Sequence, residues 1–418
     1  MATTLVQKII SSHLNGKSVE PGEIVMLPVD VVLGNDASTN GAITVLKNMG
    51  VDKVFDPAKV VTVADHFAPA KDEQSAMLLR TMEIWAKLQG VKFYAQGRGG
   101  IEHTVLIEEG WVVPGTVIGG GDSHTCTYGA LGAFGTGLGL TDIACCLALG
   151  AFWQVVPETI LVTFTGDKQR FVTGKDLILA VLEQTGVSGA TGCVLEFTGS
   201  GAQALSIDER MAVSNMAVET GAETGFFVAD EVTREYLQNR TEKHWQPEQS
   251  DEGAHFVREI HIDLDALDPL IALPSLPGNV AQVREAKGRK VDQVYIGNCA
   301  NGTMTDLRQA AEMLRGKKVH EGTRAIIVPA SQKVYKQALA EGLLDVFIDA
   351  GAMVSTPTCG ACFGGHNGVL AAGERAITTT NRNFRGRMGS PESEVYIANA
   401  FTAAASAVAG EIVDPREL

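Results

Sequence analysis

The chain has 418 residues, of which 45% are hydrophobic and 46 are glycine, so it is too long for a single hydrophobic core and predicts two or three folded domains. Its formal net charge of −15 argues against nonspecific binding to nucleic acid. The longest apolar run, residues 143–153, is shorter than the roughly 20 residues that span a bilayer, so no membrane anchor is expected.

The expected elements alternate between helices and strands, which is typical of α/β proteins with mostly parallel sheets. We expect three layered α/β/α domains over residues 1–157, 158–275 and 276–418, with the proline-containing segment 269–278 as a linker. The glycine-rich segment 135–142 is expected to open an apolar helix. Strands are expected over residues 22–30, 60–64, 91–95, 159–165, 192–198, 226–228, 294–297 and 325–328, and helices over 6–14, 41–49, 72–90, 174–184, 206–221, 305–314 and 332–341.

Three cysteines lie in glycine-rich loops. Cys359 and Cys362 form a C-x-x-C pair within residues 356–366, and Cys299 lies within residues 297–302. A C-x-x-C pair alone also occurs in zinc sites and redox pairs, and three unrelated buried cysteines are a further interpretation. All three follow expected strands in polar loops, where thiols do not pack as core, and this favours a metal centre.

The remaining cysteines are poor candidates for a fourth ligand. Cys145 and Cys146 fall in an apolar helix and Cys193 in an apolar strand, and Cys126 is also interpreted as structural. Closed zinc sites and ordinary clusters use four protein ligands. We therefore predict an iron–sulfur cluster with one iron left open for substrate. Seven cysteines without a signal-peptide pattern also fit a reducing compartment, so a cytoplasmic location is expected.

Histidines and aspartates gather after strands and glycines. One Asp-His pair ends the expected strand 60–64, where open parallel sheets bind ligands, and an Asp-Ser-His run follows three glycines. A carboxylate beside an imidazole raises the imidazole pKa and fixes its tautomer, as general acid catalysis requires. The candidates are Asp65, His66, His103, Asp122, Ser123 and His124.

A loop downstream of the cysteines carries Arg382, Arg385 and Arg387 around Gly386. A solvated basic loop is the simple interpretation. In so acidic a chain, however, guanidinium groups in one loop favour a clamp for carboxylates, which arginine binds in bidentate fashion.

Together these motifs resemble the aconitase superfamily, in particular its two-subunit branch, which comprises the large subunits of 3-isopropylmalate dehydratases and homoaconitases. The resemblance covers essentially the whole chain and includes several independent motifs in the family's order. They are Val63-Ala64-Asp65-His66, residues 119–125, the lone Cys299, the Cys359 and Cys362 pair, and residues 381–387.

The resemblance implies three α/β domains and one [4Fe–4S] cluster per subunit on Cys299, Cys359 and Cys362. Asp65 and His66 would protonate the departing hydroxyl of the substrate. The further implied catalytic residues, which pair with carboxylates beside the iron, are His103, Asp122, His124 and Glu219. The implied substrate-binding residues are Ser123, Asn381, Arg382 and Arg387.

One part of the family's pattern is missing. The family's base is a serine in a Ser-Ser-Arg segment of a fourth, mobile domain, but the only Ser-Ser here, at residues 11 and 12, is followed by His13. In the two-subunit branch a small subunit supplies this domain. We therefore expect the chain to be inactive without such a partner.

The expected activity is that of a hydro-lyase on a small hydroxy di- or tricarboxylate, first of all the isomerisation of 2- and 3-isopropylmalate in leucine biosynthesis. Homoaconitase, citramalate or another alkylmalate dehydratase shares the same motifs. An iron sensor that binds RNA is a non-enzymatic alternative, but the acidic charge, the missing fourth domain and the complete histidine set weigh against it. An electron-transfer protein would need a fully ligated cluster.

Overall fold

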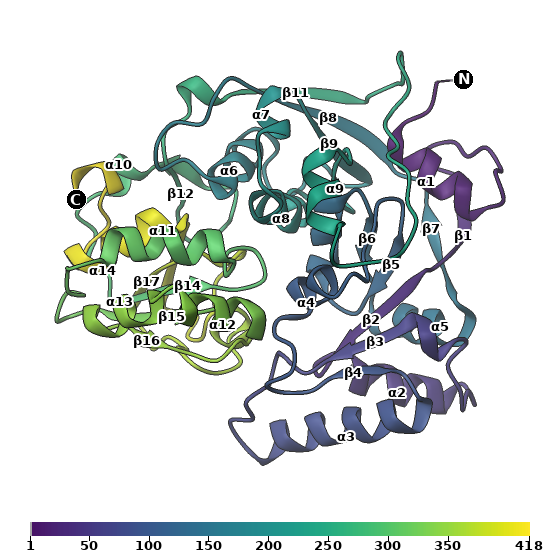
Figure 1. Cartoon of the computed structure of the whole chain (residues 1–418), viewed down its shortest axis with the longest axis horizontal. Coiled ribbons are helices and arrows are strands. Elements are labelled where there is room, and N and C mark those ends of the chain that lie inside the picture. Colours follow the sequence, from purple (N-terminus) through teal and green to yellow (C-terminus); the bar gives the residue numbers. More distant parts are fainter. Residues whose placement is uncertain (1) are drawn as a thin grey trace.

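The computed structural model describes residues 2–418, in which helices and strands alternate along most of the chain (Figure 1). The strands form three sheets of five, four and seven strands and one two-stranded ribbon. Pairing is parallel throughout the first two sheets and in most of the third. The expected α/β architecture with mostly parallel sheets is confirmed. Within the described residues, no helix is both long and apolar enough to cross a membrane.

The first unit contains a five-stranded parallel sheet and the two-stranded ribbon. Its elements are α1 (Leu5–His13), β1 (Ile24–Pro28), β2 (Val31–Asn35), α2 (Thr39–Asn48), η1 (Pro57–Lys59), β3 (Val60–Val63), α3 (Glu73–Gln89), β4 (Lys92–Tyr94), α4 (Glu102–Glu108), β5 (Val117–Gly120), η2 (Ser123–Leu131), β6 (Phe134–Gly137), α5 (Leu140–Leu149) and β7 (Ala151–Val155). The sheet order is β4-β3-β2-β5-β6, and β1 pairs with β7. The strand expected over residues 22–30 corresponds to β1, whereas β2 was not expected and is buried on both faces as a central strand is. The segment expected to open an apolar helix does so from Leu140, where α5 begins, but its first residues, 135–137, belong to β6, which pairs with β5.

The second unit is a four-stranded parallel sheet with the order β10-β9-β8-β11. Its elements are β8 (Glu158–Thr165), α6 (Gly174–Thr185), β9 (Cys193–Thr198), α7 (Ser200–Gln203), α8 (Ile207–Asn215), η3 (Ala217–Thr220), β10 (Gly225–Phe227), α9 (Glu231–Leu237), β11 (Arg258–Asp263) and η4 (Leu264–Ala266). The helix expected over residues 206–221 stops at Asn215, and a short 3-10 turn then carries Glu219.

The third unit is a seven-stranded sheet with the order β13-β12-β18-β17-β14-β15-β16, parallel from β18 to β16. Its elements are β12 (Leu270–Ala272), β13 (Val280–Gln282), α10 (Val283–Ala286), β14 (Gln293–Gly297), α11 (Met304–Leu314), β15 (Arg324–Val328), α12 (Gln332–Ala340), α13 (Leu343–Ala350), β16 (Met353–Val354), η5 (Gly360–Phe363), β17 (Arg375–Thr378), β18 (Glu394–Ala398), α14 (Ala400–Ala409) and η6 (Pro415–Glu417). The prediction of a linker over residues 269–278 is wrong, because this segment contains β12, which is buried and pairs with both β13 and β18. The domain bounds themselves remain a prediction.

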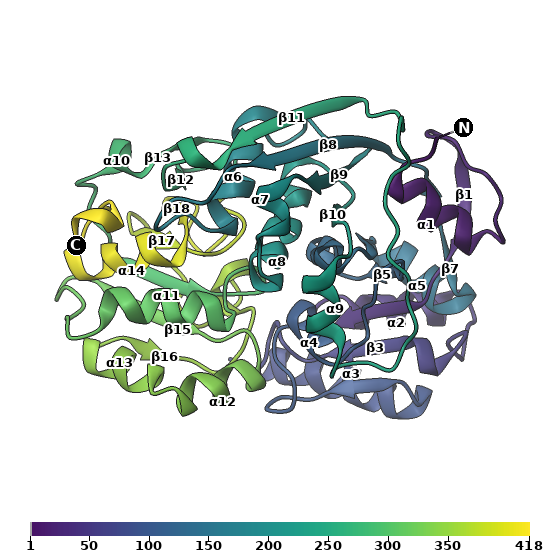
Figure 2. The same cartoon turned by 45° about the horizontal axis from the view of Figure 1, so that its top comes forward.

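The three units lie against one another, with the second spanning the other two in both views (Figures 1 and 2). Gly100 bridges to Ser331 between the first and third units. Gly129 lies so close to the second unit that a Cβ atom there would be 2.0 Å from the Gly225 carbonyl oxygen. These close approaches bring together the loops that follow the strands of each sheet, where open α/β sheets form their sites.

Candidate active site and cluster centre

The three predicted thiols converge from two loops of the third unit. Cys299 follows β14, and Cys359 and Cys362 lie at η5 between β16 and β17. All three are buried. The Asn381 side chain lies between two of them, with Oδ1 3.4 Å from Cys362 Sγ and Nδ2 3.4 Å from Cys299 Sγ.

The protonation of the pair at η5 suits metal binding. A hydrogen bond from Cys359, supported by the charge of Arg387, lowers the pKa of Cys362 to about 5. The lowered pKa favours the thiolate of Cys362, and thiolate is the form of cysteine that binds metal. Burial raises the pKa of Cys299 well above its ordinary value, so its proton leaves only with a compensating positive charge nearby.

The three thiols do not all lie as close to one another as the ligands of a single ion would. Zn–S bonds of about 2.3 Å in tetrahedral geometry place sulfur atoms about 3.8 Å apart. Among the described residues, the groups whose ligand atoms all lie within 4.8 Å of one another are Asp36–Asp65–His66 and His66–Glu102–Asp122, and the three thiols do not form such a group. A cluster is larger than one ion and holds its thiolates farther apart.

A buried tyrosine hydroxyl near the thiols, which has no hydrogen-bond partner among the described residues, also supports a cluster at this site. Tyr295 on β14 is fully buried, and its Oη has no hydrogen-bond partner in the described part of the chain. Burial raises the pKa of Tyr295 well above its ordinary value, and the charges of the three thiols add to that rise. Buried polar groups are rarely left unpaired, and a cluster sulfur would give this hydroxyl an acceptor.

Asp122 is the centre of the predicted histidine set. Its Oδ1 lies 2.9 Å from His103 Nε2 and 3.4 Å from His124 Nδ1, and its Oδ2 lies 3.7 Å from His66 Nε2. Although burial opposes its charge, hydrogen bonds from these histidines hold the pKa of Asp122 well below its ordinary value. Three imidazoles, from the loop after β3, from α4 and from η2, therefore converge on one carboxylate.

His66 is held by Asp65 as well. Its Nδ1 lies 2.6 Å from Asp65 Oδ1, and both side chains are buried. Burial opposes a charge on His66, but the charge of Asp65 and the hydrogen bond to Asp122 raise the pKa of His66 well above its ordinary value. This direction favours the protonated imidazole, which can donate a proton from Nε2.

Glu219 and Arg382 join this set from the second and third units. Glu219 Oε1 lies 2.9 Å from His124 Nε2 and 2.7 Å from Arg382 Nε. Arg382 Nη1 also donates to Ser123 Oγ at 2.8 Å. The predicted residues of all three units therefore form one connected network.

An open cavity of about 560 Å³ leads to this network. Arg387 lies in its wall and is largely buried, and the charges of Cys362 and Cys359 help raise its pKa against the effect of burial. Arg385 lies at the same mouth but donates to the Pro391 carbonyl oxygen at 2.9 Å. The cavity is lined by Val187, Val218, Glu219, Phe363, Arg382, Phe384, Arg385, Gly386 and Arg387.

The sequence analysis missed several residues that position this site. Asp36 accepts the backbone N–H groups of Asp65 and His66, each at 2.9 Å. Glu102 is buried beside them, accepts from Asn35 at 2.8 Å, and has a pKa raised well above its ordinary value by burial. Asn35 and Asp36 were expected in a polar turn. The sequence signal that could have identified them is that two polar residues follow one another at the end of an apolar strand.

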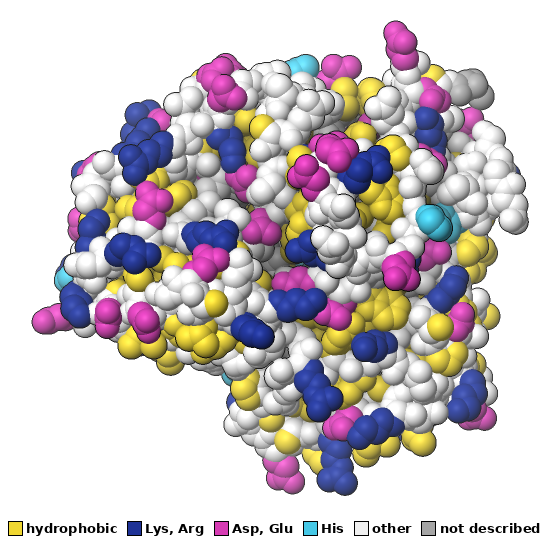
Figure 3. Space-filling view, in the orientation of Figure 1, with side chains coloured by type: hydrophobic (Ala, Val, Ile, Leu, Met, Phe, Trp, Pro, Cys, Tyr) yellow, Lys and Arg dark blue, Asp and Glu magenta, His cyan; other side chains and the backbone are white. Residues whose placement is uncertain are grey.

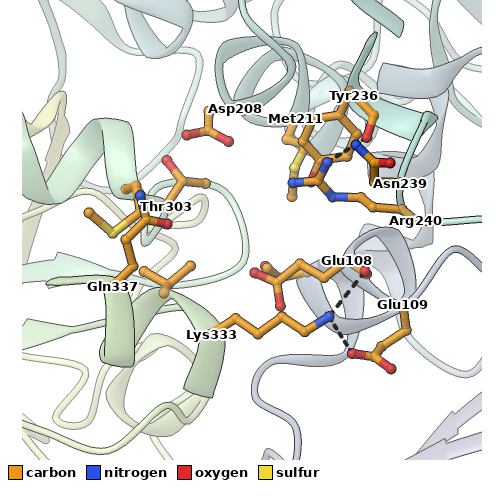
Figure 4. A pocket seen from close by; sticks show the side chains of 13 residues that line it. Glu108, Glu109, Asp208, Met211, Tyr236, Asn239, Arg240, Thr303, Lys333 and Gln337 are labelled. Atoms are coloured by element: carbon orange, nitrogen blue, oxygen red, sulfur yellow. Dashed lines mark hydrogen bonds and ion pairs between the residues drawn. The ribbon is translucent and has the colours of Figure 1, made fainter. Parts of the chain in front are cut away.

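A second cavity, of about 620 Å³, lies apart from these residues between α4, α8, α9, α11 and α12 (Figure 4). Figure 3 shows the hollow with basic and acidic side chains around it. Lys333 reaches across to Glu109, 2.6 Å away, and Arg240 lies over the Tyr236 ring. None of the predicted site residues lines this cavity.

The sequence was compared with protein-family models and known proteins. The model for the aconitase family (aconitate hydratase) matches residues 7–410. The chain belongs to the aconitase family. Membership confirms the resemblance drawn from the motifs, and the family implies a [4Fe–4S] cluster, which the donor set described above fits.

Members of the family that resemble this chain do so along its whole length. The 3-isopropylmalate dehydratase large subunit 2 of Rubrobacter xylanophilus is 65% identical over 418 residues, which is 100% of this chain and 99% of that protein. The 3-isopropylmalate dehydratase large subunit of Moorella thermoacetica is 51% identical over 419 residues, with full coverage of both chains. Large subunit 1 from Pyrococcus furiosus is 48% identical and covers 99% of each chain.

Among solved structures, Thermococcus kodakaraensis aconitase X in its holo form superposes with a TM-score of 0.55. It is 13% identical in sequence, and the alignment covers 97% of this chain and all of that one. At this level of identity the likeness concerns the fold, which extends over the whole chain.

Proposed function

We propose that this chain is the large, cluster-binding subunit of a 3-isopropylmalate dehydratase, which interconverts 2- and 3-isopropylmalate by dehydration and rehydration. The observation that carries the proposal is full-length identity of about half or more to large subunits of that name from distant organisms. The intact network of acids, histidines and arginines supports a catalytic role rather than a structural one.

In this proposal Cys299, Cys359 and Cys362 hold the cluster through three of its irons. When bound, the cluster supplies a Lewis-acidic iron, free of protein ligands, that polarises the substrate's hydroxyl and carboxylate. Of the other thiols, Cys146 packs in an apolar core, and Cys145 and Cys193 are partly exposed on α5 and β9. Cys126 is buried closer to the site, where its thiol donates to the Asn215 carbonyl oxygen at 3.2 Å.

His66 is the proposed general acid. Its Nδ1 is fixed by Asp65, so Nε2 is free to give its proton to the departing hydroxyl of the substrate. Asp122 lies 3.7 Å from Nε2 and keeps the imidazole charged until substrate enters. His103 holds the other oxygen of Asp122 and so keeps this carboxylate in place.

Arg382 and Arg387 are proposed to bind the substrate's carboxylates. Both line the open cavity, and both guanidinium groups face acidic or thiolate groups that keep them in position. Ser123 and Asn381 complete the pocket, because Ser123 accepts from Arg382 and Asn381 lies between two thiols. Glu219 holds His124 and Arg382 together.

The proton on the neighbouring carbon requires a base that this chain's sequence does not offer in a Ser-Ser-Arg segment. We propose that a small subunit supplies the base serine on a swivelling domain and closes the open cavity at Arg382 and Phe384. The name "large subunit" carried by the relatives supports a two-subunit enzyme.

The test is anaerobic co-expression with the small-subunit gene of the same genome, followed by assay on a panel of hydroxy acids. We expect reversible conversion of 2-isopropylmalate and 3-isopropylmalate by the pair and none by either subunit alone. A pair that converts homocitrate or citramalate much faster than isopropylmalate would overturn the substrate assignment. An active large subunit alone would overturn the two-subunit assignment.

A further inference from the structure

Lys175 is a fully buried cation without a carboxylate partner in the described residues. Its side chain has an exposed fraction of 0%, and its only hydrogen-bond partners there are a carbonyl oxygen and a thioether. The neighbouring Asp176 does not pair with it, because that carboxylate accepts from Leu270 N and Asn399 Nδ2 at 2.9 and 2.8 Å. An isolated buried ammonium is strongly unfavourable.

The position of Lys175 in the helix adds to this cost. It lies in the first turn of α6, where the helix dipole is positive and disfavours a cation. Burial lowers the pKa of Lys175 to about 8, and the charges of Asp306, Cys299 and Cys362 act in the opposite direction. The residue therefore lacks a stabilising partner within its own helix and depends on negative charge beyond it.

The contacts of Lys175 connect it, through the neighbours of two asparagines, to the surroundings of Cys299. Nζ donates to the Thr380 carbonyl oxygen at 3.1 Å and lies 3.0 Å from Met216 Sδ. Thr380 precedes Asn381 and Met216 follows Asn215. The two asparagines bond to each other at 2.8 Å, and their Nδ2 atoms lie 3.4 and 3.1 Å from Cys299 Sγ.

Three thiolates outweigh the positive charge of an iron–sulfur core, so a cluster on these cysteines is a buried negative centre. We propose that Lys175 is the buried counter-charge of that centre, a positioning residue that stabilises the loaded cluster and raises its reduction potential. The inference rests on the proposed assignment of the cluster to Cys299, Cys359 and Cys362. Reduction adds an electron, and a nearby fixed cation stabilises the reduced state more than the oxidised one.

The experiment compares Lys175→Met, which keeps the length of the side chain, with Lys175→Arg, which keeps the charge. Arg210→Met is the matched control, because Arg210 is also buried in the second unit but pairs with Asp230 at 2.9 Å. Each protein is reconstituted anaerobically with iron and sulfide. The midpoint potential is measured by titration with dithionite, and cluster release is followed by loss of visible absorbance in the presence of a chelator.

We expect Lys175→Met to shift the midpoint potential to a more negative value and to release its cluster several-fold faster than the wild type. Lys175→Arg should restore both values toward those of the wild type, and Arg210→Met should leave the potential unchanged. In the apoprotein, Lys175→Met should not lower the melting temperature, because it removes an unpaired buried charge. Arg210→Met should lower it, because Asp230 loses its partner.

An unchanged potential in Lys175→Met would overturn the inference. Failure of both the Met and the Arg variants to load a cluster would also overturn it, because packing and not charge would then be the requirement. If Lys175→Met loads no cluster but Lys175→Arg does, the inference is supported. A wild-type protein that loads no cluster would instead refute the proposed function, and the inference with it.

Discussion

The backbone N–H of Cys359 donates to the carbonyl oxygen of Asp65 at 2.9 Å. The next loop residue on the N-terminal side, Thr358, donates its hydroxyl to the same oxygen at 3.0 Å. This pair of bonds joins a proposed cluster ligand of the third unit to the residue that fixes the proposed general acid in the first. The distance between the proposed proton donor and the proposed metal centre is therefore fixed in part by two bonds to one backbone carbonyl oxygen.

Replacement of Cys359 by serine should abolish the visible absorbance of the reconstituted protein and the activity of the two-subunit enzyme together. A hydroxyl is a poor ligand for iron in a cluster, and only two thiolates would remain. Absorbance near the iron–sulfur bands and turnover of isopropylmalate measure the two effects. Cys145→Ser is the control, because Cys145 is a partly exposed residue of α5 outside the site, and it should retain both. Activity that survived in Cys359→Ser would contradict the cluster assignment.

Replacement of Asp65 by asparagine should lower the pKa of His66 and move the alkaline limb of the activity profile to lower pH. The charge of Asp65 favours protonated His66 against the effect of burial, and its removal leaves burial less opposed. The pKa of His66 is higher in the folded chain than its ordinary value of 6.5. The pair with Asp65 therefore stabilises the folded state fully below pH 6.5, and this stabilisation is lost as the pH rises through the higher, folded-state pKa.

The pH dependence of kcat for the two-subunit enzyme measures this shift. Asp30→Asn is a matched control, because Asp30 forms a similar pair with His13 at 2.8 Å, far from the proposed site. The control should leave the alkaline limb in place. An identical limb in Asp65→Asn and the wild type would argue against His66 as the general acid.

Replacement of Arg382 by lysine should lower kcat/KM by about 10- to 100-fold. Lysine cannot reach Glu219 and Ser123 together as the guanidinium does, and hydrogen bonds to charged groups contribute about 1.5–3 kcal/mol. Initial rates with isopropylmalate measure the loss. Arg375→Lys changes an exposed pair with Glu394 and should retain full activity. Equal activity of the two variants would remove Arg382 from the proposed substrate site.

Replacement of Gly129 by alanine should lower the stability of the chain by about 1–3 kcal/mol or more, as overpacking of a close contact does. The added Cβ would lie 2.0 Å from the Gly225 carbonyl oxygen, and its three nearest neighbours are all backbone atoms, which cannot rotate away as a flexible side chain can. Urea denaturation of the apoprotein gives the free energy of unfolding. Gly278→Ala is the control, because its Cβ would meet Val187 at an ordinary 3.4 Å. A stable Gly129→Ala protein would show that η2 and β10 separate easily.

Much of the architecture could be predicted because local pattern and burial agree. The β-branched run 60–64 forms β3, and the long helical pattern at 72–90 forms α3. The linker prediction at 269–278 failed because prolines flank β12, a strand of three residues that forms by pairing with β13 and with the distant β18. The strand β2 was missed because it forms by pairing with β3 and β5, which come later in the chain.

The sequence by itself determined the chemistry available to this protein: three thiols in glycine-rich loops, aspartates beside histidines, and arginines in one acidic chain. Only the tertiary structure decided which of them meet, since Asp122, Glu219 and Cys359 are brought together by contacts between separate sheets. It also revealed Asp36, Glu102 and Lys175, whose importance is not visible in any local motif. The sequence gives the type of each residue, but its burial and its neighbours are determined only when distant segments pack together. Burial and neighbouring charges set the pKa of a side chain, and through it the charge and the chemical role of that side chain.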